Sequence, residues 1–164
     1  MSADFLSNIR YVSAWKRGDA ALEGDAMAMW REMGVMPAGV RPEERLKELV
    51  VLAYKGARLV GITSAEVRPY APLRQRFAFM RMLMRPEAQA AGLAVPLTVH
   101  LRETLRQWSF DHPQELLAGY GAVVTDKHYM AQPILPAGLT LVGYTPDGHQ
   151  VRVFWWDHFR IPVS

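Results

Sequence analysis

The stretch that decides the fold is Met82-Leu83-Met84-Arg85-Pro86-Glu87-Ala88-Gln89-Ala90-Ala91-Gly92-Leu93-Ala94. An apolar run typical of a strand ends at its proline, and a loop of small residues around the glycine leads into a periodic helical segment. This order favours phosphate binding, because the first four N–H groups of a helix have no partner within the helix. The helix dipole adds partial positive charge there. Small side chains let a pyrophosphate approach those amides closely.

The spacing of Gln89, Gly92 and Ala94 matches a known motif. The segment Gln89-x-x-Gly92-x-Ala94 resembles the acyl-CoA-binding signature of the GNAT superfamily of N-acyltransferases, Gln/Arg-x-x-Gly-x-Gly/Ala. Arg85-Pro86-Glu87 stands where this family usually has x-Pro-Glu after an apolar strand. The alternative is a strand-to-helix turn that contains a glycine and binds nothing. The flanking residues favour the first interpretation.

The composition is ordinary for a soluble globular protein. The chain has 164 residues, about the length of one domain, and 50% of them are hydrophobic while 21% are charged. No apolar run reaches the roughly 18 residues of a membrane span, and the N-terminus lacks the features of a signal peptide. Without cysteine, disulfides, thiolate catalysis and cysteine-bound zinc are excluded. We therefore expect a cytoplasmic protein with no membrane partner.

The charge is weakly basic, with a net charge of +3 and a sequence pI near 9.4. Arginines gather at positions 68, 74, 76, 81 and 85. A basic face suits a polyanion, either CoA or a nucleic acid, although a solvated strand edge is the more typical reading outside the loop. The arginines and aromatic residues form no nucleic-acid-binding motif. No histidines and carboxylates have the helical spacing of metal ligands, so we expect neither nucleic acid nor a metal.

Strand-like and helical segments alternate, which predicts an α/β domain. Strands are predicted over 9–15, 49–54, 58–68, 76–84, 118–125, 139–144 and 150–159, and helices over 19–33, from 41, over 92–108 and briefly over 126–132. Residues 69–75 contain two prolines and are predicted to be a loop. This order matches the GNAT order over nearly the whole chain. The resemblance implies a single GNAT-like domain, 1–164, with a central mixed twisted sheet of about seven strands, strands 4 and 5 splayed, and about four flanking helices.

The family resemblance also implies how a co-substrate binds. Acetyl-CoA or another acyl-CoA would lie between the fourth and fifth strands, with no metal. Backbone groups of Met82 and Met84, on either side of Leu83, would pair with the pantetheine as an added strand does. The pyrophosphate would be held by the amides of Gln89, Ala90, Ala91, Gly92, Leu93 and Ala94. Ala90 and Ala91 replace the basic residues common before the glycine, and Arg85 could supply charge instead, or be an exposed strand end.

The chemistry implied is direct attack of an amine on the thioester. This needs a stabilised oxyanion, a base for the proton of the amine and an acid for the leaving thiolate. The sequence departs from the family at the last two roles. The fourth-strand glutamate of many members corresponds to Ala78, and the next inward position is Met80. The tyrosine that often protonates the thiolate corresponds to Ile134.

Three residues are the nearest substitutes. Tyr129 is a hypothetical acid, with a packed helix residue as the alternative. Glu66, acting directly or through water, and His128 are hypothetical bases, and a surface histidine is the alternative for His128. Asp126 is more typical of a cap on the short helix that follows it.

The leading hypothesis is therefore an acyl-CoA-dependent N-acyltransferase, most simply an acetyltransferase, that acts on a small-molecule or peptide amine. The second is a GNAT-fold protein without catalysis that binds CoA or another protein. A third, an enzyme acting on nucleic acid, rests on the pI and the arginines alone. Trp155-Trp156-Asp157-His158 is read as a strand with an aromatic residue on each face, which contributes to the core and to a contact in a homodimer.

Overall fold

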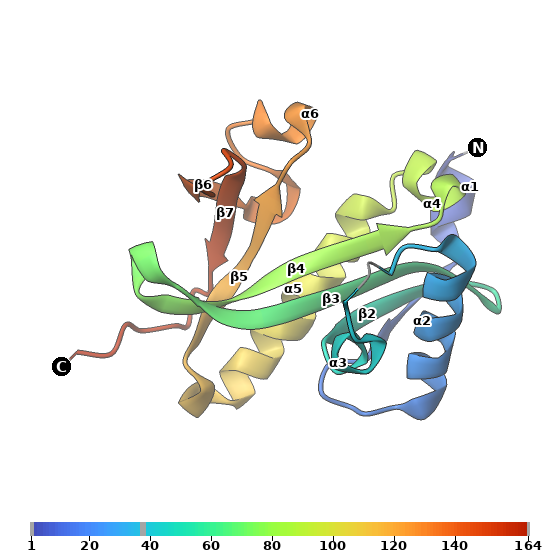
Figure 1. The fold of residues 1–164 in the computed structure, drawn as a ribbon, viewed down its shortest axis with the longest axis horizontal. Coiled ribbons are helices and arrows are strands. Elements are labelled where there is room, and N and C mark those ends of the chain that lie inside the picture. The colour runs from blue at the N-terminus through green and yellow to red at the C-terminus, as the bar shows by residue number, and fades with distance from the viewer. Residues whose placement is uncertain (1, 37–38, 164) are drawn as a thin grey trace. The chain divides into compact units, whose positions relative to one another are not determined.

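Helices and strands alternate along the chain in the computed structural model, which describes residues 2–36 and 39–163 (Figure 1). The strands are β1 (Ile9–Ser13), β2 (Leu49–Lys55), β3 (Arg58–Tyr70), β4 (Gln75–Met84), β5 (Leu117–Val124), β6 (Thr140–Tyr144) and β7 (Gln150–Trp155). The α-helices are α1 (Ser2–Ser7), α2 (Ala20–Met33), α3 (Pro42–Leu46), α4 (Pro86–Ala90), α5 (Ala94–Asp111) and α6 (Lys127–Met130). Three 3-10 helices cover Ala71–Leu73, Pro113–Glu115 and Pro136–Gly138.

The seven strands form one mixed sheet in the order β1-β2-β3-β4-β5-β7-β6. Strands β4 and β5 are parallel, whereas β1 with β2, β2 with β3, β5 with β7 and β6 with β7 are antiparallel. The predicted α/β class and the mixed seven-stranded sheet are confirmed. The register of β4 with β5 runs from Arg76 opposite Leu117 to Phe79 opposite Gly121, and residues 80–84 lie beyond its last pair.

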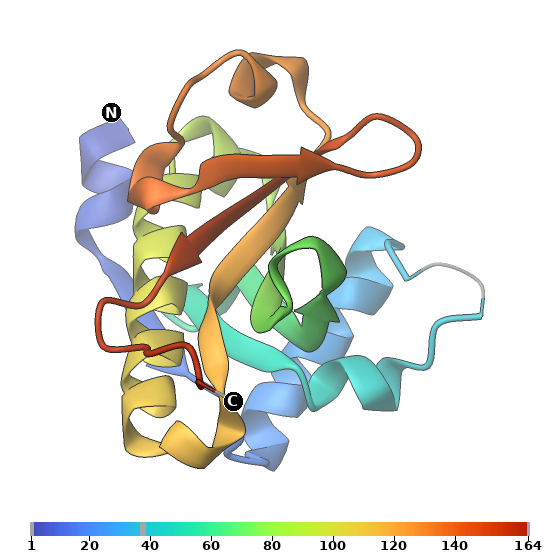
Figure 2. The same ribbon diagram turned by 90° about the vertical axis from the view of Figure 1, so that its left-hand side faces the viewer.

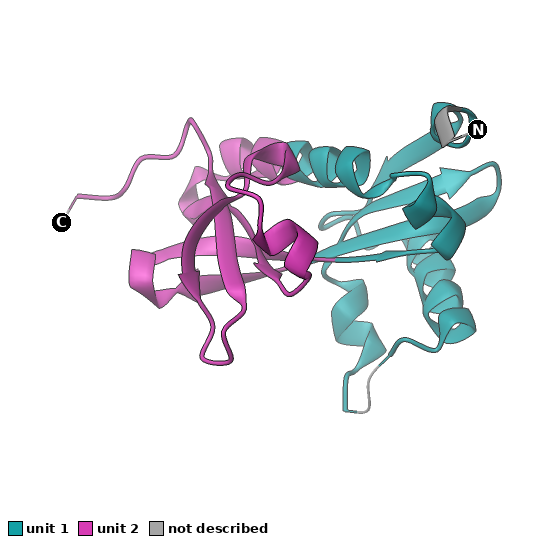
Figure 3. Ribbon diagram, turned by 90° about the horizontal axis from the view of Figure 1, so that it is seen from above, with its two compact units in different colours: residues 1–65, 82–104 teal, residues 66–81, 105–164 magenta. Residues whose placement is uncertain are grey.

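The chain divides into two compact units (Figure 3). Unit 1 comprises Met1–Ala65 and Met82–Thr104, and unit 2 comprises Glu66–Arg81 and Leu105–Ser164. Strands β3 and β4 and helix α5 each start in one unit and continue into the other.

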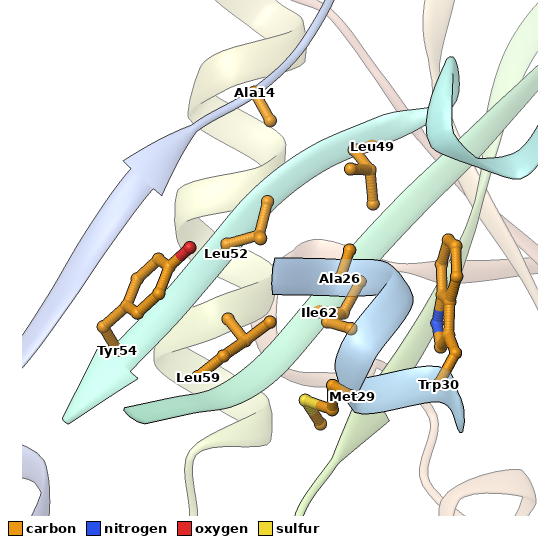
Figure 4. Close-up of a cluster of buried hydrophobic side chains, with 9 residues drawn as sticks. All are labelled: Ala14, Ala26, Met29, Trp30, Leu49, Leu52, Tyr54, Leu59 and Ile62. Carbon is orange, nitrogen blue, oxygen red and sulfur yellow. The ribbon is translucent and has the colours of Figure 1, made fainter. Parts of the chain in front are cut away.

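The core of unit 1 is built where α2 packs on β2 and β3 (Figure 4). The helix begins at Asp19, whose carboxylate accepts hydrogen bonds from the amides of Ala21 and Leu22. It ends at Gly34, which adopts a left-handed conformation with φ 61°. Its buried side chains meet those of the two strands, and Ala14 after β1, in a cluster of Ala14, Ala26, Met29, Trp30, Leu49, Leu52, Tyr54, Leu59 and Ile62.

Helix α5 approaches β3 closely, and a glycine makes this possible. A Cβ atom at Gly61 would lie 3.0 Å from Leu97 Cδ2 and 3.1 Å from Leu93 Cδ2. Leu93, Leu97 and Leu101 are fully buried. This packing fixes the start of α5, and therefore the connection that leads into it from β4.

The core of unit 2 lies between β4, β5 and β7, and β5, β7 and β6 run side by side (Figure 2). Its buried members are Phe77, Phe79, Ala118, Val151 and Val153. A Cβ atom at Gly119 would lie 1.8 Å from the carbonyl oxygen of Phe154, so no other residue fits there without a shift of the backbone.

Several predicted boundaries are wrong: β1 ends at Ser13 instead of Trp15, and the ends of β3 and β7 also differ. Strand β3 continues through Pro69 to Tyr70 instead of giving way to a loop at residue 69, because the φ of proline suits an extended chain wherever its missing N–H is not needed. Strand β7 ends at Trp155 instead of continuing to Phe159. The amide of Phe159 donates to the carbonyl of Trp156, which turns the chain, and Trp156 itself is buried.

Candidate functional site

The connection between β4 and α5 is a helical turn followed by a glycine bend. Residues predicted as a loop form the short helix α4, with Pro86 at its first position, where a missing N–H costs nothing. The carbonyl of Arg85 accepts hydrogen bonds from the amides of Ala88 and Gln89, both at 3.0 Å. The α5 helix begins at Ala94 instead of Gly92, since Gly92 has a φ of +86°, which no helical residue adopts.

Gly92 is required by its backbone conformation. Its left-handed φ is one that other residues adopt only with strain. Apart from its two chain neighbours, no described residue has an atom within 4 Å of where a Cβ would lie, so the space beside the glycine is open. An open space beside a left-handed glycine leaves room for a ligand to approach the backbone.

The amides of this connection divide into two groups. Those of Gln89, Ala91, Gly92 and Leu93 donate to backbone carbonyls nearby, with distances of 3.0–3.1 Å. The amides of Ala94 and Val95, the first two of α5, have no acceptor among the residues that the structure describes. Pro96 has no N–H, and Leu97 donates to the carbonyl of Leu93. The amides left without an acceptor are thus that of Ala94, at the end of the predicted run, and that of Val95, one residue beyond it.

The side chain of Arg85 is buried beneath this connection. Its Nε donates to the carbonyl oxygen of Leu59 at 2.7 Å, and its two terminal nitrogens donate to the carboxylate of Glu32 at 3.0 and 2.9 Å. These hydrogen bonds and the opposite charges raise the pKa of Arg85 and hold the pKa of Glu32 below its usual range. The prediction of an exposed strand end is wrong. The charge is engaged by Glu32, which leaves little of it for a phosphate.

The last residues of β4 alternate between the two faces of the sheet. Leu83 packs against the unit 1 cluster beside α2, and Met82 and Met84 therefore project to the other face. All three side chains are partly buried. Pairing of their backbone with a pantetheine chain stays a prediction.

Tyr129 and His128 lie on α6, in unit 2. Asp126 accepts a hydrogen bond from the amide of His128 at 2.8 Å, so the predicted helix cap is confirmed. The rings of Tyr129 and His128 meet edge to face with centroids 5.4 Å apart, and His128 Nε2 lies 3.3 Å from Gln132 Nε2. The side chain of Tyr129 is exposed, which keeps its hydroxyl accessible.

Glu66 is exposed on β3, also in unit 2. Its carboxylate lies 3.5 Å from a terminal nitrogen of Arg81 and 4.0 Å from Nε of Arg68. The two positions where the family carries its base and acid offer no such group here. Ala78 is fully buried, and Ile134 is exposed and forms an isolated bridge with Thr140.

Solved structures of other proteins share this architecture at low sequence identity. A GNAT-family acetyltransferase from Streptococcus pneumoniae matches with a TM-score of 0.52 and 12% identity, over 88% of this chain and 96% of its own. A putative acetyltransferase from Salmonella typhimurium, solved with its cofactor acetyl-CoA, matches with a TM-score of 0.59 and 14% identity, over 96% and 99%. N-acetylglutamate synthase from Neisseria gonorrhoeae, complexed with coenzyme A and L-arginine, matches with a TM-score of 0.57 and 13% identity. The match covers 92% of this chain and 34% of the synthase chain. The chain has the GNAT fold.

The likeness is one of structure. No protein-family model matches the sequence, and no curated protein matches it either. Within residues 2–36 and 39–163, no group of three or more histidine, aspartate or glutamate side chains could hold a metal ion. No helix in the same described part of the chain is long and apolar enough to cross a membrane.

One polar cluster of this GNAT fold was not predicted from the sequence. Arg152 on β7 is 1% exposed, and its guanidinium donates to the side-chain oxygen of Gln150 and to backbone carbonyls. These carbonyls belong to Tyr129, Met130, Gln132, Pro133 and Leu139. The side-chain amide of Gln150 also donates to the carbonyl of Met130, and the buried Tyr120 hydroxyl donates to the carbonyl of Ala137. The irregular segment 126–139, which carries Tyr129, is thereby tied to β5 and β7.

The sequence signal that could have predicted this cluster is the alternation of polar and apolar residues at the start of β7. Gln150 and Arg152 occupy alternate positions in an otherwise apolar strand, so they share one face of the sheet. Two polar residues on one face of a buried strand need partners there. The sequence does not say which carbonyls those partners are.

Proposed function

We propose that this chain is an acyl-CoA-dependent N-acyltransferase, with acetyl-CoA as the simplest co-substrate, and that residues 1–164 work as one GNAT acyltransferase domain. The observation that carries the proposal is the β4–α5 connection within a GNAT fold. There, the left-handed Gly92 has open space beside its own Cα, and the amides of Ala94 and Val95 have no acceptor among the described residues. Two N–H groups at the start of an 18-residue helix suit a phosphate group.

The roles of the chain's own residues follow from this arrangement. Ala94 and Val95 would donate to the pyrophosphate, with Gln89, Ala90, Ala91, Gly92 and Leu93 shaping the bend that presents them. Met82, Leu83 and Met84 would offer the backbone of β4 to the pantetheine. Bound acyl-CoA supplies an activated thioester, which an amine attacks directly.

Proton transfer is assigned to residues outside the usual family positions. Tyr129 would give a proton to the leaving sulfur, because its hydroxyl is accessible and its segment is held by Arg152. Water would take the proton of the amine, with Glu66 and His128 as the alternatives. A pH profile of turnover separates these routes, since a side-chain base adds an inflection that its substitution removes.

A second function is favoured by one observation. The family positions of the base and the acid are occupied by a buried alanine, Ala78, and an exposed isoleucine, Ile134. A GNAT-fold protein that binds CoA or a protein partner without catalysis would need neither group. In that case CoA binds but no amine is acylated.

The experiment that tests the proposal is calorimetric titration of acetyl-CoA, followed by a transfer assay over a panel of small amines and peptides. Gly92→Glu should abolish acetyl-CoA binding, because its carboxylate would enter the space that the phosphates need. Gly148→Glu is the matched control, since Gly148 has a φ of +88° and equally open surroundings but lies in the β6–β7 turn. Equal affinities in wild type and Gly92→Glu would refute the co-substrate assignment.

A further inference from the structure

The run of amides predicted to hold a pyrophosphate keeps two backbone donors for a ligand. Among residues 89–95, four amides already donate to carbonyls of the connection, and that of Ala90 lies within α4. Those of Ala94 and Val95 have no acceptor in the part of the chain that the structure describes. Two N–H groups in the first turn of α5 suit the oxygens of one phosphate. CoA also carries a second phosphate in its pyrophosphate and a 3′-phosphate on its ribose, and this run has no further backbone donor for either.

The charges on this connection cancel in pairs. Between Met84 and Val95 the chain carries one basic residue, Arg85, and one acidic residue, Glu87. Arg85 lies 2.9 Å from the carboxylate of Glu32, and Glu87 lies 3.3 Å from the guanidinium of Arg58, at the start of β3. All four residues belong to unit 1. Two arginines and two glutamates have no net charge, so this group gives a nucleotide phosphate no ionic attraction beyond that of the helix.

Arg58 does not make up for the missing charge. Its side chain is 59% exposed, and an exposed ion pair is weak enough to exchange. An arginine that turned from Glu87 to a phosphate, however, would leave the carboxylate of Glu87 beside the same anion. Ala90 and Ala91 occupy the positions where the family often has basic residues, so they add no charge either.

We propose that this chain recognises its acyl donor through the phosphopantetheine half alone, so that acyl phosphopantetheine, without the nucleotide, is a donor comparable to acyl-CoA. This rests on the proposed acyltransferase function. The backbone of β4 would pair with the pantetheine. Because β4 runs through the short α4 into α5 (Figure 1), the phosphate next to the pantetheine is the one that Ala94 and Val95 would bind. The nucleotide half of CoA would extend beyond these contacts and add little affinity.

The chemical step is the same for both donors. The amine nitrogen forms a bond to the acyl carbon, the carbon–sulfur bond breaks with its electron pair on sulfur, and the proton lost by nitrogen ends on sulfur. The products are the amide and a free thiol. No atom of the nucleotide takes part, so the nucleotide can affect the reaction only through binding.

The test measures the binding of ligands that lose one piece at a time. By calorimetric titration of wild type, CoA and 3′-dephospho-CoA should bind less than about tenfold more tightly than 4′-phosphopantetheine. Pantetheine, which has no phosphate, should bind at least about tenfold more weakly than 4′-phosphopantetheine, the scale of a hydrogen bond to a charged group. The values of kcat/KM for acetyl-CoA and acetyl phosphopantetheine should likewise agree within about tenfold.

Ala94→Pro removes one of the two donors and keeps the helix. Leu93 is the N-cap of α5, because its carbonyl accepts from the amide of Leu97, and proline suits the position that follows an N-cap. The variant should weaken the binding of CoA and of phosphopantetheine by the same factor, about tenfold, and leave pantetheine unchanged. Ala20→Pro, the same change at the first residue of α2, is the matched control and should alter none of these affinities.

The proposal is overturned if CoA binds more than about tenfold more tightly than phosphopantetheine, or if pantetheine binds as tightly as phosphopantetheine. If Ala94→Pro loses helix by circular dichroism, the ligand series on wild type decides alone. If CoA binds and no amine is acylated, the acyltransferase function fails, and the same series still decides how the donor is recognised. If CoA itself does not bind, both proposals fail.

Discussion

Two buried arginines hold irregular segments in the two units, and they are neutralised in different ways. In unit 1, Arg85 fixes the start of the β4–α5 connection and pairs with a carboxylate, Glu32, which is itself 61% exposed. In unit 2, Arg152 fixes the segment that carries Tyr129 and has no carboxylate partner among the described residues. Its charge is met by one side-chain amide oxygen and several carbonyl dipoles. The β4–α5 connection is therefore held by an ion pair, whereas segment 126–139 is held by hydrogen bonds from a guanidinium to backbone carbonyls.

The difference teaches where each segment is vulnerable. An ion pair with one exposed partner loses strength when the acid is protonated or when salt screens it. A buried guanidinium surrounded by carbonyls responds to neither, but its removal leaves many buried acceptors without a donor. Unit 1 should therefore be sensitive to conditions, and unit 2 to substitution.

The largest effect is expected from Arg152→Met. The change keeps an apolar stem and removes the guanidinium donors to the carbonyls of Tyr129, Met130, Gln132, Pro133 and Leu139, so the free energy of unfolding should fall by about 3–5 kcal/mol. Urea denaturation followed by circular dichroism measures it. Arg152→Lys should recover part of the loss, because one ammonium can still serve some of these carbonyls. A loss below about 1 kcal/mol would contradict the comparison.

Tyr129→Phe tests whether the segment that Arg152 holds also has a catalytic role. If the segment held by Arg152 serves to place an acid, loss of this hydroxyl should lower kcat by roughly 10²-fold, the usual scale for a general acid. The affinity for acetyl-CoA should barely change, since the loss is one oxygen atom. Steady-state kinetics and calorimetry on the same preparation separate the two effects. Wild-type turnover would return Tyr129 to a packing role.

Arg85→Met should destabilise the protein less than Arg152→Met does. It leaves the carbonyl of Leu59 without its side-chain donor, but Glu32 is exposed and stays solvated, so a loss of about 1–3 kcal/mol is expected. The same variant should weaken acetyl-CoA binding, because Arg85 anchors the turn before Gly92. If Arg85→Met and Arg152→Met prove equally destabilising, the contrast between the two segments fails.

The smallest effect is a dependence on acid in unit 1. Arg85 lowers the pKa of Glu32, so the folded form binds this proton less readily than the unfolded chain. The stabilisation is fully present above the unfolded pKa of a glutamate and is lost as the pH falls through the lower folded value. Denaturation midpoints measured between pH 6 and pH 3 should therefore decline less in Glu32→Gln than in wild type. Parallel curves would show that the pair contributes nothing.

The order of elements could be predicted from the sequence because local signals agree with the fold. Asp19 and Gly34 bound α2, and alternating apolar residues mark the strands. Helix α4 was missed because five residues after a proline carry too little periodicity to separate a helix from a loop. The start of α5 was misplaced by two residues because the φ of Gly92 depends on tertiary packing.

The candidate site could be predicted only as far as local backbone geometry reaches. A strand, a proline and a glycine identify the connection, but which amides remain available depends on the carbonyls that α4 brings close. The partners of Arg85 lie 26 and 53 residues away in the chain, and those of Arg152 lie 2 to 23 residues away. Such pairings follow from the sheet and not from sequence spacing. The same holds for Arg58, whose partner Glu87 lies on α4.

Pro96 gives the start of α5 a simple spectroscopic signature. Because proline lacks an N–H and Leu97 already has an acceptor, Ala94 and Val95 are the two amides of that first turn that should exchange rapidly with deuterium in the free protein. In a nitrogen-15 correlation spectrum they contribute two cross-peaks. A phosphate group bound there would slow the exchange of both and shift both resonances. The occupancy of the site can thus be followed through two assigned signals, without an enzymatic assay.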